Sequence, residues 1–192
     1  LMPYIKEFHK KYPKISIRVF TDKTSDLIKK AKMGLIDVIF TNLPLSLSTD
    51  FDTYKLTNLH DCFVANNNFS YLKGHKITKS DLEKLPLIVL TKGATSRISF
   101  DDYCLENDIN ITPEMEFGSN TLIKEFTEAG FGIGMLTEEY LKNDLKSQKL
   151  FKLDIEIPLN SKYLGMVWPI DNKSLVAHNF IEFIKSSTHS QE

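Results

Sequence analysis

The first forty residues switch between the two hydrophobic periods that separate strands from helices. Residues 14–20 alternate apolar and polar side chains, which is the period of a strand. Thr24 and Ser25 are good helix N-caps, and apolar residues then recur at helical spacing until Gly34 ends the segment. Residues 38–40 form a short apolar run typical of a strand buried on both faces. This order predicts a β-α-β unit with parallel strands and a right-handed crossover, and hence an α/β fold.

The same alternation recurs further along the chain. Residues 80–83 resemble a capping box for a short helix, and later apolar runs alternate with helical segments. Residues 163–168 predict a strand that returns to the first lobe before a last amphipathic helix. The pattern therefore predicts two lobes joined by two crossings that act as a hinge. We expect subdomain I to comprise residues 1–70 and 162–192, and subdomain II residues 71–161.

Composition narrows the class of protein. The 192 residues are 42% hydrophobic and 26% charged, which excludes a disordered chain. The chain has 24 Lys and Arg residues and 25 Asp and Glu residues. It therefore lacks the excess of basic residues that is expected of a chain that binds nucleic acid by itself. No apolar run reaches the roughly 18 residues of a membrane span, and the first residues do not resemble a signal peptide. We expect a cytoplasmic protein and, since residue 1 is Leu, a piece of a longer one.

Familiar catalytic patterns are weak in this sequence. The glycines at 130, 132 and 134 follow a predicted helix and open a strand, the reverse of a dinucleotide site, so a helix C-cap with close packing is favoured. His178 and Glu182 share a helix face but have no further metal ligands. Glu114 and Glu116 are better explained as surface charge than as an acid–base pair. The sequence predicts neither an enzyme nor a metal or cofactor site.

Polar residues recur at helix starts that follow strands. The three cases are Thr24-Ser25, Thr95-Ser96-Arg97 and Ser119-Asn120-Thr121. Each offers free backbone N–H groups at the positive end of a helix dipole, and in open α/β sheets ligands bind at such points. Arg97 adds a planar fork suited to a carboxylate. Each start alone is better explained as an ordinary N-cap, but the three together favour an anion cleft.

The order of these segments resembles the effector-binding (regulatory) domain of LysR-type transcriptional regulators. Residues 1–13 are similar to the first regulatory helix of that family, which ends in Tyr-Pro, as Tyr12-Pro13 does here. Residues 24–39 resemble its Ser-x-x-Leu … Gly-x-Leu-Asp-Leu-Ala stretch, and residues 129–136 its Ala-Gly-Leu-Gly-Ile-Ala-Leu-Leu run. Thr137 stands where the family commonly has Pro.

The resemblance implies two Rossmann-like subdomains with a hinge and central cleft, a fold of the type 2 periplasmic-binding-protein class. It implies a small effector in that cleft, and homodimers or homotetramers that bind DNA only through an N-terminal winged helix-turn-helix absent from this chain. Carried over by position, the residues expected to contact effector are Thr24, Ser25, Asn42, Gly93, Thr95, Ser96 and Arg97, with Ser119 added from its helix start. Arg97 favours an anionic effector, such as an organic acid or amino acid.

Two cysteines bear on a redox alternative within the same family. Cys62 and Cys104 are flanked by apolar residues and predict reduced core thiols. The redox-sensing branch of the family needs two nearby cysteines in the second lobe, whereas we place Cys62 in the first. One alternative is a stand-alone solute-binding protein of the same fold serving a transporter. Another is a small enzyme using the same cleft, which would need a converging nucleophile, base or metal set, and the sequence indicates none.

Overall fold

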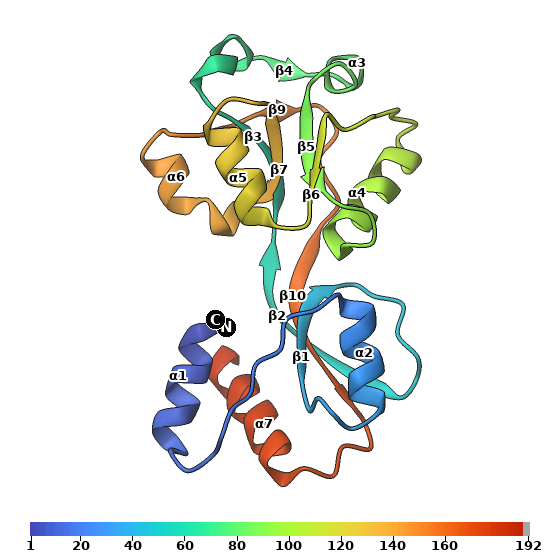
Figure 1. Ribbon diagram of the computed structural model, residues 1–192, viewed down its shortest axis with the longest axis vertical. Helices are drawn as coiled ribbons and strands as arrows, with labels where there is room; N and C mark the ends of the chain where they lie inside the picture. Colours follow the sequence, from blue (N-terminus) through green and yellow to red (C-terminus); the bar gives the residue numbers. More distant parts are fainter. Residues whose placement is uncertain (190–192) are drawn as a thin grey trace. The chain divides into compact units, whose positions relative to one another are not determined.

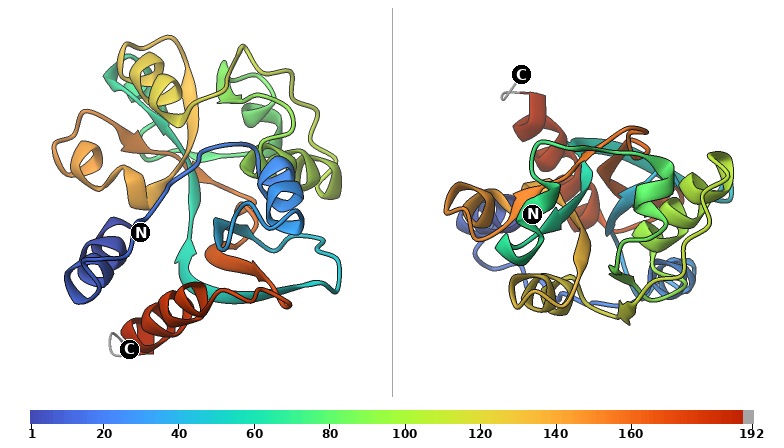
Figure 2. Two further views of the ribbon diagram at one scale, coloured as in Figure 1. Left: turned by 60° about the horizontal axis from the view of Figure 1, so that its bottom comes forward. Right: turned by 90° about the horizontal axis from the view of Figure 1, so that it is seen from above.

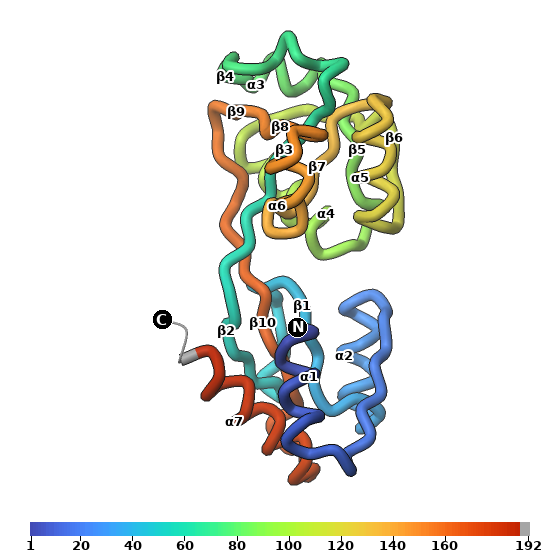
Figure 3. The backbone as a smooth tube through the Cα atoms, turned by 90° about the vertical axis from the view of Figure 1, so that its left-hand side faces the viewer, coloured from blue at the N-terminus to red at the C-terminus, as the bar shows by residue number. Residues whose placement is uncertain are grey.

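A computed structural model describes residues 1–189 (Figure 1). The chain forms two compact units, one comprising Leu1–Thr57 and Tyr163–Glu192 and the other Asn58–Lys162. We call them unit 1 and unit 2. The chain passes between them twice, within strand β2 (Phe51–Leu59) and at the start of β10 (Lys162–Pro169) (Figure 3). The first passage comes earlier than the expected boundary near residue 70, because Asp61–Ala65 joins the sheet of unit 2.

A three-stranded sheet lies at the centre of unit 1. Its order is β1 (Ile39–Leu43), β10 and β2, and β1 runs antiparallel to β10. Ile39 and Leu43 pack with α2 (Thr24–Lys32) on one side, while Met166 and Trp168 pack with α7 (Leu175–His189) on the other. Helix α1 (Met2–Lys11) lies beside α7 through edge-to-face contacts of its buried Phe8 with Phe180 and Phe183. Buried and half-buried residues alternate along β1, as the two faces of a strand require.

Residues 14–20 do not form the predicted strand. The segment has no regular structure, and Val19 and Phe20 are 68% and 53% exposed. A groove of about 690 Å³ is lined by residues of this segment and of β1, mostly apolar ones. A strand exists only where a neighbour pairs with its backbone, and within residues 1–189 no strand pairs with this segment. The predicted parallel β-α-β unit is therefore wrong, although its helix and second strand are present.

Unit 2 is built on a five-stranded sheet in the order β6 (Met115–Phe117), β5 (Leu87–Leu90), β7 (Ile133–Thr137), β3 (Asp61–Ala65), β8 (Phe151–Lys152). Strand β5 runs parallel to β6 and β7, whereas β3 is antiparallel to β7 and β8. Every residue of β5 and β7 is buried, and residues 87–90 and 133–136 are the apolar runs from which the two strands are predicted. The smaller elements are β4 (Lys76–Ile77), which pairs with β9 (Asp154–Ile155), and the short helices η1 (Asn67–Leu72), α3 (Lys79–Leu82), η2 (Glu138–Tyr140) and α6 (Lys142–Lys146).

Helices cover both faces of this sheet (Figures 1 and 2). Helix α4 (Thr95–Glu106) packs Phe100 and Tyr103 onto one face, and α5 (Asn120–Glu128) packs Ile123 onto the other. The capping box before α3 is formed by Thr78 and Asp81, two residues earlier than the predicted start at residue 80. Both patterns fit the capping rule, and only the backbone decides between them.

The glycine run after α5 is used for close packing, as the sequence predicts. A Cβ atom on residue 134 would lie 2.3 Å from the Thr127 hydroxyl of α5, and one on residue 132 would lie 2.4 Å from the Pro86 carbonyl. Gly130 ends the helix at φ +85°, a conformation that favours glycine. Gly134 therefore lets α5 pack closely on the sheet, and Gly132 lets the start of β7 approach the residues around the start of β5.

Candidate functional site

In unit 1, a pair of hydroxyl groups joins the start of α2 to β1. Thr24, the first residue of α2, has its Oγ1 2.9 Å from Oγ1 of Thr41 in β1. Ser25 is exposed beside it, so this helix start presents hydroxyl groups at the positive end of the helix dipole. Asn42 follows Thr41, and strand alternation places its side chain on the other face of β1. Sequence reasoning missed Thr41, whose signal is a polar residue at an inward position between Ile39 and Leu43.

In unit 2, a tight turn leads from β5 into α4. Gly93 adopts φ +88°, and the Thr91 N–H donates to the Phe117 carbonyl, so the chain reverses directly into the helix at Thr95. The next residue, Ser96, accepts a hydrogen bond of 2.9 Å from the ammonium of Lys162. The predicted residues Gly93, Thr95 and Ser96 thus gather at one helix start, as expected.

Arg97 has a different environment from the one the sequence predicts. Its side chain is only 4% exposed, its Nε donates to Asp101 at 2.7 Å, and its Nη1 lies 2.8 Å from both the Leu90 carbonyl and Glu116. Burial opposes the charge, but the hydrogen bonds to Asp101 and Glu116 outweigh it and raise the pKa of Arg97. Its guanidinium ties α4 to β5 and β6. These acceptors engage its Nε and Nη1 within unit 2.

A second buried cation lies at the same end of the unit 2 sheet. Lys162, the first residue of β10, lies 2.6 Å from Oδ2 of Asp61, and both side chains are less than a tenth exposed. The other oxygen of Asp61 accepts a 2.8 Å hydrogen bond from Thr137 at the end of β7. With Ser96, these residues join the ends of four elements, and we call them the Lys162 network. Sequence reasoning missed this network, because a lysine before an apolar strand resembles a solvated one.

Ser119, the third predicted helix start, is the N-cap of α5. Its Oγ accepts a hydrogen bond of 3.2 Å from the Thr121 N–H. This is the ordinary capping role that we weighed against ligand binding. The structure therefore assigns its hydroxyl to holding the helix start.

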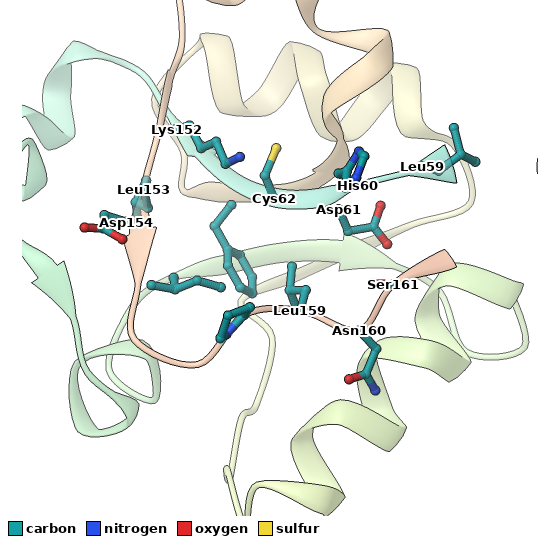
Figure 4. Close-up of a pocket in the computed structure, with 13 residues that line it drawn as sticks. Leu59, His60, Asp61, Cys62, Lys152, Leu153, Asp154, Leu159, Asn160 and Ser161 are labelled. Carbon is teal, nitrogen blue, oxygen red and sulfur yellow. The ribbon is translucent and has the colours of Figure 1, made fainter. Parts of the chain in front are cut away.

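A cavity of about 270 Å³ lies beside β3 in unit 2 (Figure 4). Two of its polar side chains are paired within the protein: His60 lies 2.7 Å from Glu139, and Lys152 lies 2.6 Å from Glu138. None of the predicted site residues lines it. Asp61 is the one member of the Lys162 network on its wall.

Both cysteines belong to unit 2, which corrects the placement of Cys62 in the first lobe. Cys62 packs into the core on one face of the sheet, whereas Cys104 packs against the core on the other. Both are free thiols. Burial raises the pKa of Cys62 to about 12 and that of Cys104 to about 11, so both are protonated at neutral pH. A reactive thiolate pair is not favoured by this arrangement.

Within residues 1–189, no cluster of three His, Cys, Asp or Glu side chains is placed to hold a metal ion. In the same part of the chain, no helix has the length and apolar character needed to cross a membrane.

Solved structures identify the class of this fold. The Synechocystis PCC6803 CcmR regulatory domain, in complex with 2-PG, superposes with a TM-score of 0.86 at 18% identity, covering 97% of this chain and 90% of that one. The effector binding domain of QuiR in complex with shikimate gives 0.83 at 16% identity, covering 98% and 90%. The fold is therefore that of the effector-binding domains of LysR-type regulators, which confirms the predicted α/β class.

Sequence comparison gives the family. Residues 1–188 match the family described as LysR substrate binding domain, and the chain belongs to that family. A curated relative, the HTH-type transcriptional activator CmpR of Synechocystis sp., is 26% identical over 179 residues. The match covers 93% of this chain but 59% of CmpR, so the chain spans about three fifths of that relative's length.

Proposed function

We propose that this chain is the ligand-sensing domain of a LysR-type transcriptional regulator and that it binds a small anionic effector. Family membership supports the sensing role, and the relatives it matches are transcriptional regulators. This favours a regulator over the alternative of a solute-binding protein for a transporter. We further propose that the complete protein acts in the cytoplasm as a homodimer or homotetramer, and that it contacts DNA through a domain outside this chain.

The observation that carries the proposal is the repeated chemistry of two helix starts. The starts of α2 and α4 each present hydroxyl groups, and in each a hydroxyl is hydrogen-bonded to a buried side chain, Thr41 or Lys162. Such groups are held in place before a ligand arrives, which lowers the entropic cost of binding. Helix N-termini also favour negative charge. We therefore propose that Thr24, Ser25, Thr95 and Ser96 contact the effector, with Gly93 shaping the turn.

The role of the remaining predicted residues is revised in this proposal. Arg97 and Ser119 position α4 and α5, because their polar groups are bonded to Asp101, Glu116 and the Thr121 N–H. Asn42 stays a predicted contact on the opposite face of β1 from Thr41. We propose binding without catalysis.

A thermal-shift screen of the chain against carboxylates, phosphates, amino acids and sugars tests this function. A ligand at about 100 times its Kd adds roughly 2.7 kcal/mol of stability. For a chain of this length the melting temperature then rises by roughly 5–10 °C. We expect Thr24→Val and Ser96→Ala each to reduce the shift, while Ser99→Ala, one turn along α4, leaves it unchanged. Equal shifts in all four proteins would refute the proposed site.

A further inference from the structure

The Lys162 ammonium is short of one acceptor. A lysine carries three N–H donors and no acceptor. Among residues 1–189, its partners are one oxygen of Asp61 at 2.6 Å and the Ser96 hydroxyl at 2.9 Å. The side chain is 4% exposed, so the remaining donor gains little from bulk solvent. A buried charge is costly unless its hydrogen bonds are completed, which makes this a place where an added oxygen is favoured.

Asp61 positions the Lys162 ammonium but does not bond all three of its N–H groups. Its second oxygen is held by the Thr137 hydroxyl at 2.8 Å, so the carboxylate is fixed between two donors. It holds the ammonium in place against Ser96 at the first turn of α4. Asp61 therefore acts as a clamp that positions the cation, and the third N–H is left over after the clamp is complete.

Ser96 links this cation to the proposed effector. Because lysine can only donate, the Ser96 oxygen is the acceptor in their hydrogen bond. An effector oxygen in contact with Ser96 at this helix start therefore lies within about 6 Å of the Lys162 Nζ. At that distance, the Lys162 ammonium and an anionic group of the effector attract each other even without direct contact.

We propose that Lys162 is the residue that selects an anionic effector, its third N–H binding a carboxylate or phosphate oxygen of the ligand beside Ser96. This inference rests on the proposed function and deepens it, because it names the charged contact that Arg97 does not supply. Asp61 is the positioning residue, and its negative charge weakens the attraction of the site for the same anion. The two charged residues should therefore act in opposite directions.

Substitutions at both positions test the proposal with malonate, inorganic phosphate and shikimate as probes, followed by calorimetric titration of the 192-residue chain. For the probe that binds the wild type most tightly, Lys162→Met should weaken binding by about 10- to 100-fold. Asp61→Asn keeps an oxygen for Lys162 but removes the charge, and should tighten binding at least about threefold. Lys152→Met, which removes the exposed partner of Glu138, is the matched control and should change nothing.

Loss of Lys162 leaves Asp61 buried without its cation and can unfold the chain. The double variant Asp61→Asn/Lys162→Met removes both charges, and it should fold while still binding the anion weakly. Unchanged affinity in the folded double variant would overturn the proposal, as would failure of all three anions to bind the wild type. The methyl ester of shikimate separates the two levels. If the neutral ester binds as tightly as shikimate and Ser96→Ala abolishes both, the effector site stands and the role of Lys162 falls.

Discussion

Substitution of Arg97 tests whether this buried charge stabilises the fold or binds the effector. The structure predicts that Arg97→Met destabilises the protein while leaving effector affinity within about threefold of wild type. Methionine fills much of the volume of the arginine stem, so the change removes mainly the polar contacts. Those contacts join α4 to the buried strand β5 through the Leu90 carbonyl and to β6 through Glu116.

The magnitude follows from those contacts. The buried Leu90 carbonyl loses one hydrogen-bond donor, which lowers the free energy of unfolding by about 1–3 kcal/mol. Asp101 and Glu116 are 50% and 34% exposed, so water replaces Arg97 there and each ion pair contributes less than about 1 kcal/mol. The expected total is about 3 kcal/mol, which lowers the melting temperature by about 6–12 °C in a chain of 192 residues.

Thermal unfolding by circular dichroism gives the stability, and titration with the best anion from the screen gives the affinity. Arg18→Met is the matched control, because Arg18 is exposed in the irregular segment before α2. That variant should shift the melting temperature by less than about 2 °C. The reasoning fails if Arg97→Met melts like Arg18→Met and loses anion binding at the same time, since Arg97 would then be a ligand contact.

Three further predictions concern packing, burial and charge. Gly134→Ala should destabilise the protein by about 1–3 kcal/mol in urea unfolding, because the new methyl group clashes with α5, whereas Gly118→Ala, with open space around it, should cost less than about 1 kcal/mol. The Cys62 thiol, with its pKa raised to about 12 by burial, should resist maleimide at neutral pH until urea unfolds the protein; mass spectrometry showing full labelling of the native state would contradict this. Hydrogen bonds from Thr78 lower the pKa of Asp81 below its ordinary value of 3.8. The Asp81 carboxylate therefore stabilises the fold at pH values above 3.8, and this stabilisation is lost as the pH falls through the lowered pKa. An NMR titration of Asp81 with a midpoint at or above 3.8 would contradict this prediction.

Elements with a complete local signal could be predicted from the sequence. The apolar runs of β5 and β7 and the polar starts of α2 and α4 are all where the pattern places them. Residues 14–20 have the period of a strand but lack a neighbour, and a neighbour is not encoded in the segment itself. A hydrophobic period alone does not predict which distant segments pair as neighbouring strands.

The site residues divide in the same way. The predicted starts of α2 and α4 are confirmed at Thr24 and Thr95, but the predicted side-chain capping is wrong, because the N-caps are Lys23 and Ala94 and neither helix start has a side-chain cap bond. The partner of Arg97 at Asp101 was within reach of sequence reasoning, because the two are four residues apart on one helix. Lys162 and Asp61 are about a hundred residues apart, and only the folded sheet brings them together. Their ion pair could not be predicted from spacing.

The two passages of the chain between the units have a consequence for folding order. Strand β10 lies between β1 and β2 in the unit 1 sheet, so that sheet cannot form until residue 162 and those after it have been made. Unit 2 is complete at that moment. Because Asp61 and Lys162 meet within unit 2, its folding brings the two flanking ends of unit 1 together. That closes a loop of about 100 residues, which otherwise costs about 4 kcal/mol of chain entropy. We therefore expect the inserted unit to fold first during synthesis and to act as the template on which the N-terminal residues assemble last.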